Sequence, residues 1–465
     1  MQKYLFKNIQ VVNEGKIKTQ DVLINGDRIE KIGTQIESIG STKEYDGEGK
    51  FLMPGVIDDQ VHFREPGLTH KANIYTESRA AVAGGVTSFM EMPNTIPNAL
   101  TRKLLEDKYE IAKNTSLANY SFYMGVSNDN FEEAIGINNF KNEICGLKIF
   151  MGSSTGNMLV DNHSTLNKIF SESELLIATH CEDERIIKSN LEKFKQAGVP
   201  LTAKDHPIIR NDEACFESSL VAIQFAKKYN SRLHILHIST AKELQLFSNM
   251  LPLKEKRITA EVCVHHLHFT ADDYEALGYK IKCNPAIKAP ANKAALWEAL
   301  LDDRLDVIAT DHAPHLLEEK GYPLNSKGAA PSPLGKDGTG LYEKAYAGLP
   351  LVQHGLQLML YYQSIGKISL EKIAQKMSHD VAECFQVQNR GYIREGYFAD
   401  LVVADLNATQ KVAEDNILYK CGWSPLEGFT MPASIVQTMV SGNIVYENGR
   451  FYESCKGQRL SFDRT

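Results

Sequence analysis

The chain has 465 residues, 43% of them hydrophobic and 23% charged, and a formal net charge of −7. This length favours one large domain with a smaller companion, and the composition is that of an ordinary globular protein. The acidic balance and the lack of a long Lys/Arg run exclude a nucleic-acid-binding surface. No stretch of about 18 apolar residues is present to span a membrane. The eight Cys residues show no CxxC spacing, and no secretion signal is visible, so we expect a cytoplasmic protein with reduced thiols.

Short strands are predicted at both ends of the chain. Near the N-terminus they are Tyr4–Val12, Asp21–Ile24 and Arg28–Ile32, and Asn25-Gly26 between the last two is a strong hairpin signal. Near the C-terminus they are Tyr392–Ile393, Ala399–Asp405 and Val436–Asn448. We therefore expect residues 1–53 and 391–465 to fold together as a small β-sandwich domain built from both termini.

The middle of the chain, residues 54–390, alternates short apolar runs with longer amphipathic stretches. Strand–helix alternation is typical of a parallel sheet with crossover helices, and eight units are the number that closes a (β/α)₈ barrel. A doubly wound open sheet is the alternative architecture. The eight runs predicted to be strands are Val56–His62, Val86–Met92, Tyr120–Gly125, Gly146–Met151, Leu175–His180, Leu233–Ile238, Ile258–Cys263 and Asp306–Asp311.

Other segments of this middle part carry their own signals. Glu213–Tyr229 is predicted to be a helix that is capped by Asn211-Asp212. Leu316–Ala347 is rich in Gly, Pro, Ser and Lys, and a connection of this length is usually functional or mobile. Two further helices are predicted at Leu351–Gln363 and Leu370–Phe385.

Polar residues stand at or near the ends of five of the apolar runs. Taken singly, a His there is more often hydrogen-bonded structure, an Asp a helix cap and a Lys the partner of a carboxylate. In a barrel, however, the C-terminal ends of the strands converge on one mouth. Imidazole and carboxylate ligands that meet there suit Zn²⁺ best. The five residues are His62, Lys148, His180, His237 and Asp311.

These residues and their surroundings resemble the amidohydrolase superfamily and, within it, the dihydroorotases. The resemblance covers nearly the whole chain. Pro54–Asp58 and Gly391–Asp405 are similar to marks of the whole superfamily. His62–Gly67 and Met92–Thr95 are similar to the dihydroorotase versions, and Asp311–His315 is shared with allantoinases.

The resemblance implies a role for each site residue. His62 and Asp311 would hold one Zn²⁺, and His180 and His237 a second, with Lys148 as a carbamate bridge between them. Asp311 would also be the catalytic acid and base. The substrate-binding residues would be Arg64, Asn94, Asn284 and His315.

The sequence departs from the family at two points. Gln60 stands where the superfamily usually has a His, so the first metal site is expected to be weak or rebuilt, and Asp58 and Asp59 are the nearby carboxylates that could compensate. Ala330–Pro333 has Pro where the family's pocket loop has Gly. The run His265–His268 is interpreted as pocket wall and not as a set of ligands.

The implied activity is the reversible cyclisation of N-carbamoyl-L-aspartate to L-dihydroorotate in de novo pyrimidine biosynthesis. The alternatives are an allantoinase- or hydantoinase-type cyclic amidase, and a non-catalytic partner of aspartate carbamoyltransferase. We expect a small-molecule substrate, one or two Zn²⁺ ions and a homodimer, with a possible association with aspartate carbamoyltransferase.

Overall fold

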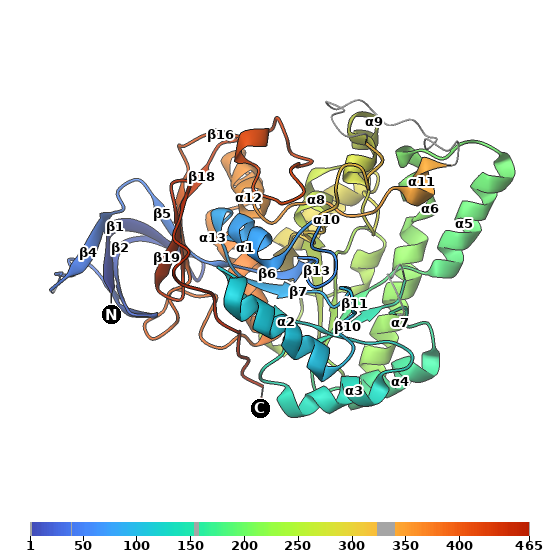
Figure 1. Cartoon of the computed structure of the whole chain (residues 1–465), viewed down its shortest axis with the longest axis horizontal. Coiled ribbons are helices and arrows are strands. Elements are labelled where there is room, and N and C mark those ends of the chain that lie inside the picture. The colour runs from blue at the N-terminus through green and yellow to red at the C-terminus, as the bar shows by residue number, and fades with distance from the viewer. Residues whose placement is uncertain (1, 39, 153–157, 323–339, 465) are drawn as a thin grey trace.

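The computed structural model describes residues 2–38, 40–152, 158–322 and 340–464. One large sheet lies on the left of Figure 1, and a series of parallel strands covered by helices lies on the right. Among the described residues, no helix is long and apolar enough to cross a membrane.

The large sheet has nine strands and joins the two ends of the chain. Its order is β20-β19-β18-β15-β5-β1-β2-β3, and β4 pairs with β1. Because β5 pairs with both β1 and β15, the N-terminal and C-terminal strands share one hydrogen-bonded sheet. The strands are β1 Lys3–Asn13, β2 Lys16–Asn25, β3 Arg28–Gly33, β4 Thr42–Asp46, β5 Phe51–Pro54, β15 Leu401–Asp405, β18 Ser434–Val440, β19 Asn443–Glu447 and β20 Arg450–Phe451.

One predicted strand of this region is wrong. Tyr392–Ile393 forms no strand, because a side chain takes the place of a strand partner: the amide group of Asn13 bonds both the N–H and the carbonyl of Ile393. A separate pair, β16 Gln410–Lys411 and β17 Thr430–Met431, completes the C-terminal part.

The eight strands predicted for the middle of the chain are confirmed, with the third in two pieces. Each pairs in parallel with the next, because β7 joins β6 to β8 and the sheet from β9 to β14 continues the series. The ends of the series also meet, since His62 N–H donates to the carbonyl of His312 at 2.7 Å. The strands are β6 Val56–Val61, β7 Val86–Glu91, β8 Asn119–Phe122, β9 Met124–Gly125, β10 Leu147–Phe150, β11 Ile177–His180, β12 Leu233–Ile235, β13 Ile258–Cys263 and β14 Val307–Ala309.

Helices connect and cover these strands (Figure 1). The predicted cap of α7 is confirmed, since the side chain of Asn211 accepts from Ala214 N–H. The helices are α1 Ile74–Ala83, α2 Arg102–Thr115, α3 Phe131–Gly136, α4 His163–Glu172, α5 Glu184–Ala197, α6 His206–Ile209, α7 Asp212–Tyr229, α8 Val264–His268, α9 Tyr274–Leu277, α10 Pro290–Leu301, α11 Leu341–Lys344, α12 Gly355–Ser364, α13 Leu370–Ala374 and α14 Asp380–Phe385.

The two late predicted helices are also confirmed, as α12 and as the run from α13 to α14, which a π-helical turn, Gln375–His379, joins. Of the long connection, residues 316–322 and 340–347 are described, and they include α11. The predicted loop Ala330–Pro333 lies outside the described residues.

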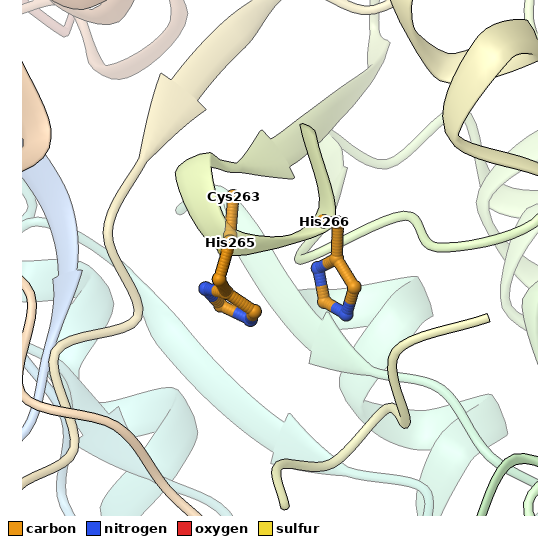
Figure 2. Close-up of side chains that lie close together, drawn as sticks. All are labelled: Cys263, His265 and His266. Carbon is orange, nitrogen blue, oxygen red and sulfur yellow. The ribbon is translucent and has the colours of Figure 1, made fainter. Parts of the chain in front are cut away.

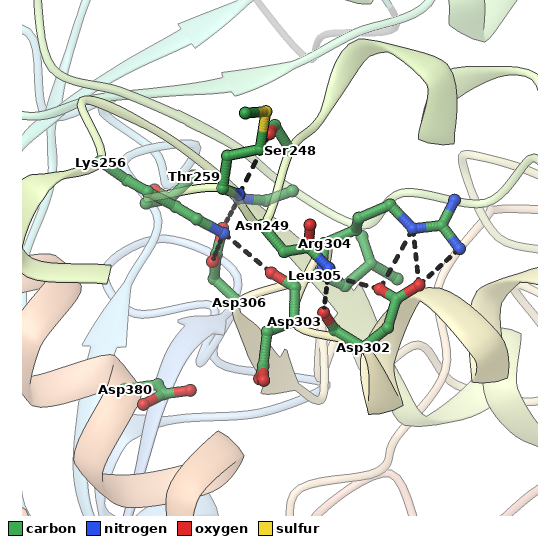
Figure 3. A network of polar contacts seen from close by, with 12 residues as sticks. Ser248, Asn249, Lys256, Thr259, Asp302, Asp303, Arg304, Leu305, Asp306 and Asp380 are labelled. Atoms are coloured by element: carbon green, nitrogen blue, oxygen red, sulfur yellow. Dashed lines mark hydrogen bonds and ion pairs between the residues drawn. The ribbon is translucent and has the colours of Figure 1, made fainter. Parts of the chain in front are cut away.

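An ion-pair network anchors the N-terminal ends of β13 and β14 (Figure 3). Lys256 Nζ lies 2.7 Å from Asp306 Oδ1 and donates to the carbonyl of Asp303 at 2.8 Å. Lys376, which is 1% exposed, donates to the carbonyls of Leu305 and Asp306. These contacts fix the strands at the end opposite to the predicted site, which leaves the C-terminal ends free to carry functional groups.

Candidate functional site

All nine predicted site residues line one cavity of about 980 Å³. His62 follows β6, Lys148 lies in β10, His180 ends β11, and His237 and Asp311 come two residues after β12 and β14. The C-terminal ends of parallel strands therefore bring the five predicted metal ligands to one wall. Arg64, Asn94, Asn284 and His315 line the same cavity.

The backbone at three of these residues is left-handed, which is uncommon for residues other than Gly. The φ angles are 68° at Arg64, 42° at His237 and 44° at Asp311. Such conformations cost about 1–3 kcal/mol each and cluster at functional sites. The turn after Arg64 also needs Gly67, which has a φ of 86°, because a Cβ there would lie 2.2 Å from the carbonyl oxygen of Ile96.

His62 and Asp311 lie next to each other in the cavity lining. His62 Nε2 lies 3.2 Å from Asp311 Oδ1, and His62 Nδ1 lies 2.8 Å from Asn94 Oδ1. Because an amide oxygen only accepts, Nδ1 carries the proton and Nε2 turns its lone pair toward the carboxylate. Burial lowers the pKa of His62, which favours this neutral form. Two acceptors in this arrangement suit a cation between them.

Gln60 completes this half of the site in an unexpected way. Its Nε2 donates to Asp311 Oδ1 at 3.1 Å, so the amide turns its donor toward the cavity carboxylate. Asp58 and Asp59 do not compensate for the missing imidazole. Asp58 accepts from the hydroxyl of Thr310, and Asp59 lies 3.2 Å from His234 Nε2, away from the cavity lining.

His180 and His237 form the other half. His180 Nδ1 lies 3.0 Å from His237 Nε2, and His180 Nε2 lies 3.0 Å from the Glu182 carboxylate. Nε2 therefore carries the proton, and the lone pair of Nδ1 faces His237. His237 Nδ1 is buried and has no hydrogen-bond partner among the described residues. This pair also fits a cation.

Glu182, which lies outside the lining, and Arg210, which belongs to it, support this half, and the sequence did not predict them. Arg210 donates to Glu182 at 2.5 Å. Burial would raise the pKa of Glu182, but Arg210 and His180 bring it down to about 2, so the carboxylate is charged. A carboxylate that fixes a ligating imidazole is a common second layer of metal sites. The sequence feature that could have predicted Glu182 is its position two residues after His180, at the end of a predicted strand.

Lys148 is 1% exposed, and none of the ion pairs within the described ranges includes it. Burial lowers its pKa to about 7. An uncharged amine at this position can react with CO₂, which a protonated ammonium cannot do. The donor set of the whole wall therefore fits one or two divalent cations.

A second polar group belongs to the cavity lining. Arg64 donates through Nε to the carbonyl of Pro314 and lies 3.0 Å from His315 Nε2 through Nη2. Lys71 lies 2.7 Å from Glu319 and 3.1 Å from His315 Nδ1. Two cations and one carboxylate leave this side of the cavity positive. Lys71 and Glu319 were not predicted.

Asn284 lies in a third part of the lining. Its Oδ1 is 3.1 Å from Nε2 of the buried His206, whose Nδ1 lies 2.8 Å from the hydroxyl of Tyr342. The run His265–His268 was predicted to be pocket wall, and this prediction is wrong, because none of its residues belongs to the cavity lining.

Comparisons with known proteins bear on the family of the chain. The model of the Amidohydrolase family matches residues 51–445. Dihydroorotases from Methanosphaera stadtmanae and Pyrococcus furiosus are each 30% identical, covering 97% of this chain and 98% and 96% of the relatives.

Solved structures give the same picture of the fold. The L-hydantoinase of Arthrobacter aurescens superimposes with a TM-score of 0.89 at 25% identity, over 99% of this chain and 100% of that one. The dihydropyrimidinase of Brevibacillus agri gives 0.86 at 24% identity, over 100% of both chains. The chain therefore has the amidohydrolase-type α/β fold and belongs to the amidohydrolase family.

Proposed function

We propose that this protein is a dihydroorotase, which closes N-carbamoyl-L-aspartate to L-dihydroorotate and runs the reverse hydrolysis in de novo pyrimidine biosynthesis. The observation that carries the proposal is the convergence of nine residues, chosen from the sequence alone, on one cavity. Relatives that bear the name dihydroorotase match nearly the whole chain.

The proposed metal is Zn²⁺, with one or two ions in each chain. His62 and Asp311 would hold one ion, His180 and His237 the other, and Lys148 as a carbamate would bridge them. When bound, Zn²⁺ supplies a Lewis acid for the ring amide and activates water. The acceptor atoms of His62 and Asp311 lie close together, and so do ring nitrogens of His180 and His237, which supports this assignment.

Asp311 is proposed to move the proton. In hydrolysis its carboxylate takes a proton from the attacking water and delivers it to the leaving ring nitrogen, as general base and then general acid. Gln60 donates to Oδ1, which holds the carboxylate in one orientation while the other oxygen is available for the proton.

Arg64 is proposed to bind the substrate carboxylate, with Asn94 and His315 beside it and Asn284 at the ring. Guanidinium binds a carboxylate in a bidentate fashion. The positive balance of Arg64, Lys71 and Glu319 supports an anion at this place. Within the described part of the chain, Arg64 Nη1 has no hydrogen-bond partner, so it is available to a ligand.

The architecture that we propose is a (β/α)₈ barrel over residues 54–390, with a small β-sandwich domain from residues 1–53 and 391–465. The bond between His62 and His312, which joins the first and last strands of the series, supports closure of the barrel. A homodimer in the cytoplasm, with aspartate carbamoyltransferase as a possible partner, completes the proposal.

The first test is the hydrolysis of dihydroorotate by the purified, zinc-supplemented protein. Turnover that a chelator removes would establish the reaction. In Arg64→Met we expect kcat/KM for dihydroorotate to fall by roughly 100-fold or more, because the loss of one member of a buried charge pair costs about 2–5 kcal/mol. Activity toward hydantoin, which lacks the carboxylate, should change little.

A hydantoinase-type amidase is the second candidate, because the structures that superimpose on this chain include an L-hydantoinase. Turnover of hydantoin without turnover of dihydroorotate would favour it. A folded protein that binds little zinc and turns over neither ring would instead favour the non-catalytic partner.

A further inference from the structure

Outside the cavity lining, a thiol and two imidazoles meet at the end of β13. Cys263 is the last residue of this strand, and His265 and His266 lie in α8, which follows directly. One ligand atom from each of the three lies within 4.8 Å of the others. Figure 2 shows the two rings side by side beneath this turn, with their centroids 4.2 Å apart.

The imidazoles have polar atoms that nothing in the described chain satisfies. His265 is 1% exposed, and neither of its ring nitrogens makes a hydrogen bond of good geometry there, although the backbone of Thr310 lies close enough to interact with the ring. His266 Nε2 donates to the carbonyl of Pro285 at 3.1 Å, which leaves the lone pair of Nδ1 without a partner. A buried polar atom without a partner destabilises the folded chain, so such atoms call for an explanation.

We propose that Cys263, His265 and His266 form a further metal site, which binds a thiophilic divalent cation such as Zn²⁺. One thiolate and two imidazoles are ligands that Zn²⁺ prefers, whereas Mg²⁺ and Ca²⁺ prefer oxygen. None of the three residues lines the cavity, and none belongs to the wall assigned to catalysis. The site is therefore additional to the proposed function.

The surroundings can accept the proton that the thiol must lose. Cys263 Sγ donates to Glu261 Oε1 at 3.2 Å. On binding, the S–H bond breaks, an S–metal bond forms, and the proton passes to the Glu261 carboxylate, which becomes a neutral acid.

The site is one side chain away from the cavity. Gln60 Oε1 lies 3.8 Å from Cys263 Sγ, while Gln60 Nε2 donates to Asp311. The amide oxygen of Gln60 is thus placed to serve as a fourth, neutral ligand. Glu261 Oε1 also accepts from His237 N–H at 2.9 Å, so Cys263 is connected to His237 through Glu261.

Cobalt gives a readout that only this site can produce. The catalytic wall contains no sulfur ligand, so a thiolate-to-Co²⁺ charge-transfer band in the near ultraviolet would report on Cys263. We expect Co²⁺-loaded wild-type protein to show the band, and Zn²⁺-loaded protein to show a Zn–S shell at about 2.3 Å in X-ray absorption. Cys263→Ser should lose both signals and bind one metal fewer in each chain.

Cys215→Ser is the matched control, because Cys215 is also fully buried but lies outside the cluster. It should keep the band. A second variant, His265→Gln, should weaken the band without removing a thiol, which covers the case in which Cys263→Ser does not fold. A band that survives in folded Cys263→Ser, or a loaded wild-type protein with only nitrogen and oxygen around its metal, would overturn the proposal.

Discussion

Glu182 does not line the cavity, yet it fixes the orientation of the His180 ring, which does. Its carboxylate holds the Nε2 proton of His180 and is itself held by Arg210. We expect Glu182→Gln to weaken zinc binding by roughly 10–100-fold, as is typical for the loss of a partner that orients a ligand. Competition with a chromophoric chelator would measure this change.

The control for that variant is Glu192→Gln, on the exposed side of α5. It removes the same charge from the same region without contact to a predicted ligand, so its zinc affinity should equal that of the wild type. Equal affinities for both variants would show that Glu182 does not orient His180.

Among the elements, the run from α13 to α14 depends on one buried cation. Lys376 bonds two carbonyls before β14 and lies 3.1 Å from Asp380. Lys376→Met would leave these acceptors and carboxylates unpaired, and breaking a buried pair in this way costs about 3–5 kcal/mol. We expect the variant to unfold at a clearly lower urea concentration than the wild type.

Lys372 provides the comparison for this prediction. It lies on the same run and pairs with Asp303, but its partner is 47% exposed, so solvent screens the contact. Lys372→Met should therefore lower stability by less than about 1 kcal/mol. If the two variants lose the same stability, burial does not govern the strength of this anchor.

Some of these elements could be predicted from the sequence and others could not. The eight parallel strands were predictable because buried strands are continuous apolar runs, and the shared location of the five strand-end residues followed from them. The missing strand at Tyr392–Ile393 was not predictable, because its partner is the side chain of Asn13, about 380 residues away along the chain. The roles of Lys71 and Arg210 were not predicted for the same reason, because only the fold brings Lys71 to Glu319 and Arg210 to Glu182.

At the scale of the whole molecule, the cavity concentrates arrangements that oppose folding. Left-handed backbone at Arg64, His237 and Asp311 is one of them, and an unpaired buried lysine is another. The apolar core, which runs through the strands and the covering helices, offsets these costs. Metal that binds only the folded chain would offset these costs further. In protein without metal, we therefore expect removal of the unpaired buried lysine to raise the free energy of unfolding.

Lys148→Met tests this expectation through its dependence on pH. Burial lowers the pKa of Lys148 from 10.5 to about 7. Between these values the unfolded chain binds a proton that the folded chain does not, so stability rises with pH across this window. Below pH 7 the folded protein must hold a buried ammonium, so the destabilisation by Lys148 is then at its greatest.

Methionine keeps the length of the side chain and removes the charge. In protein stripped of metal and CO₂, we therefore expect Lys148→Met to melt a few degrees above the wild type at pH 6, with the gap closing toward pH 10. Lys103→Met, at a lysine that is 81% exposed, should show no such trend. A gap of the same size at both pH values would mean that packing, and not the buried charge, separates Lys148→Met from the wild type.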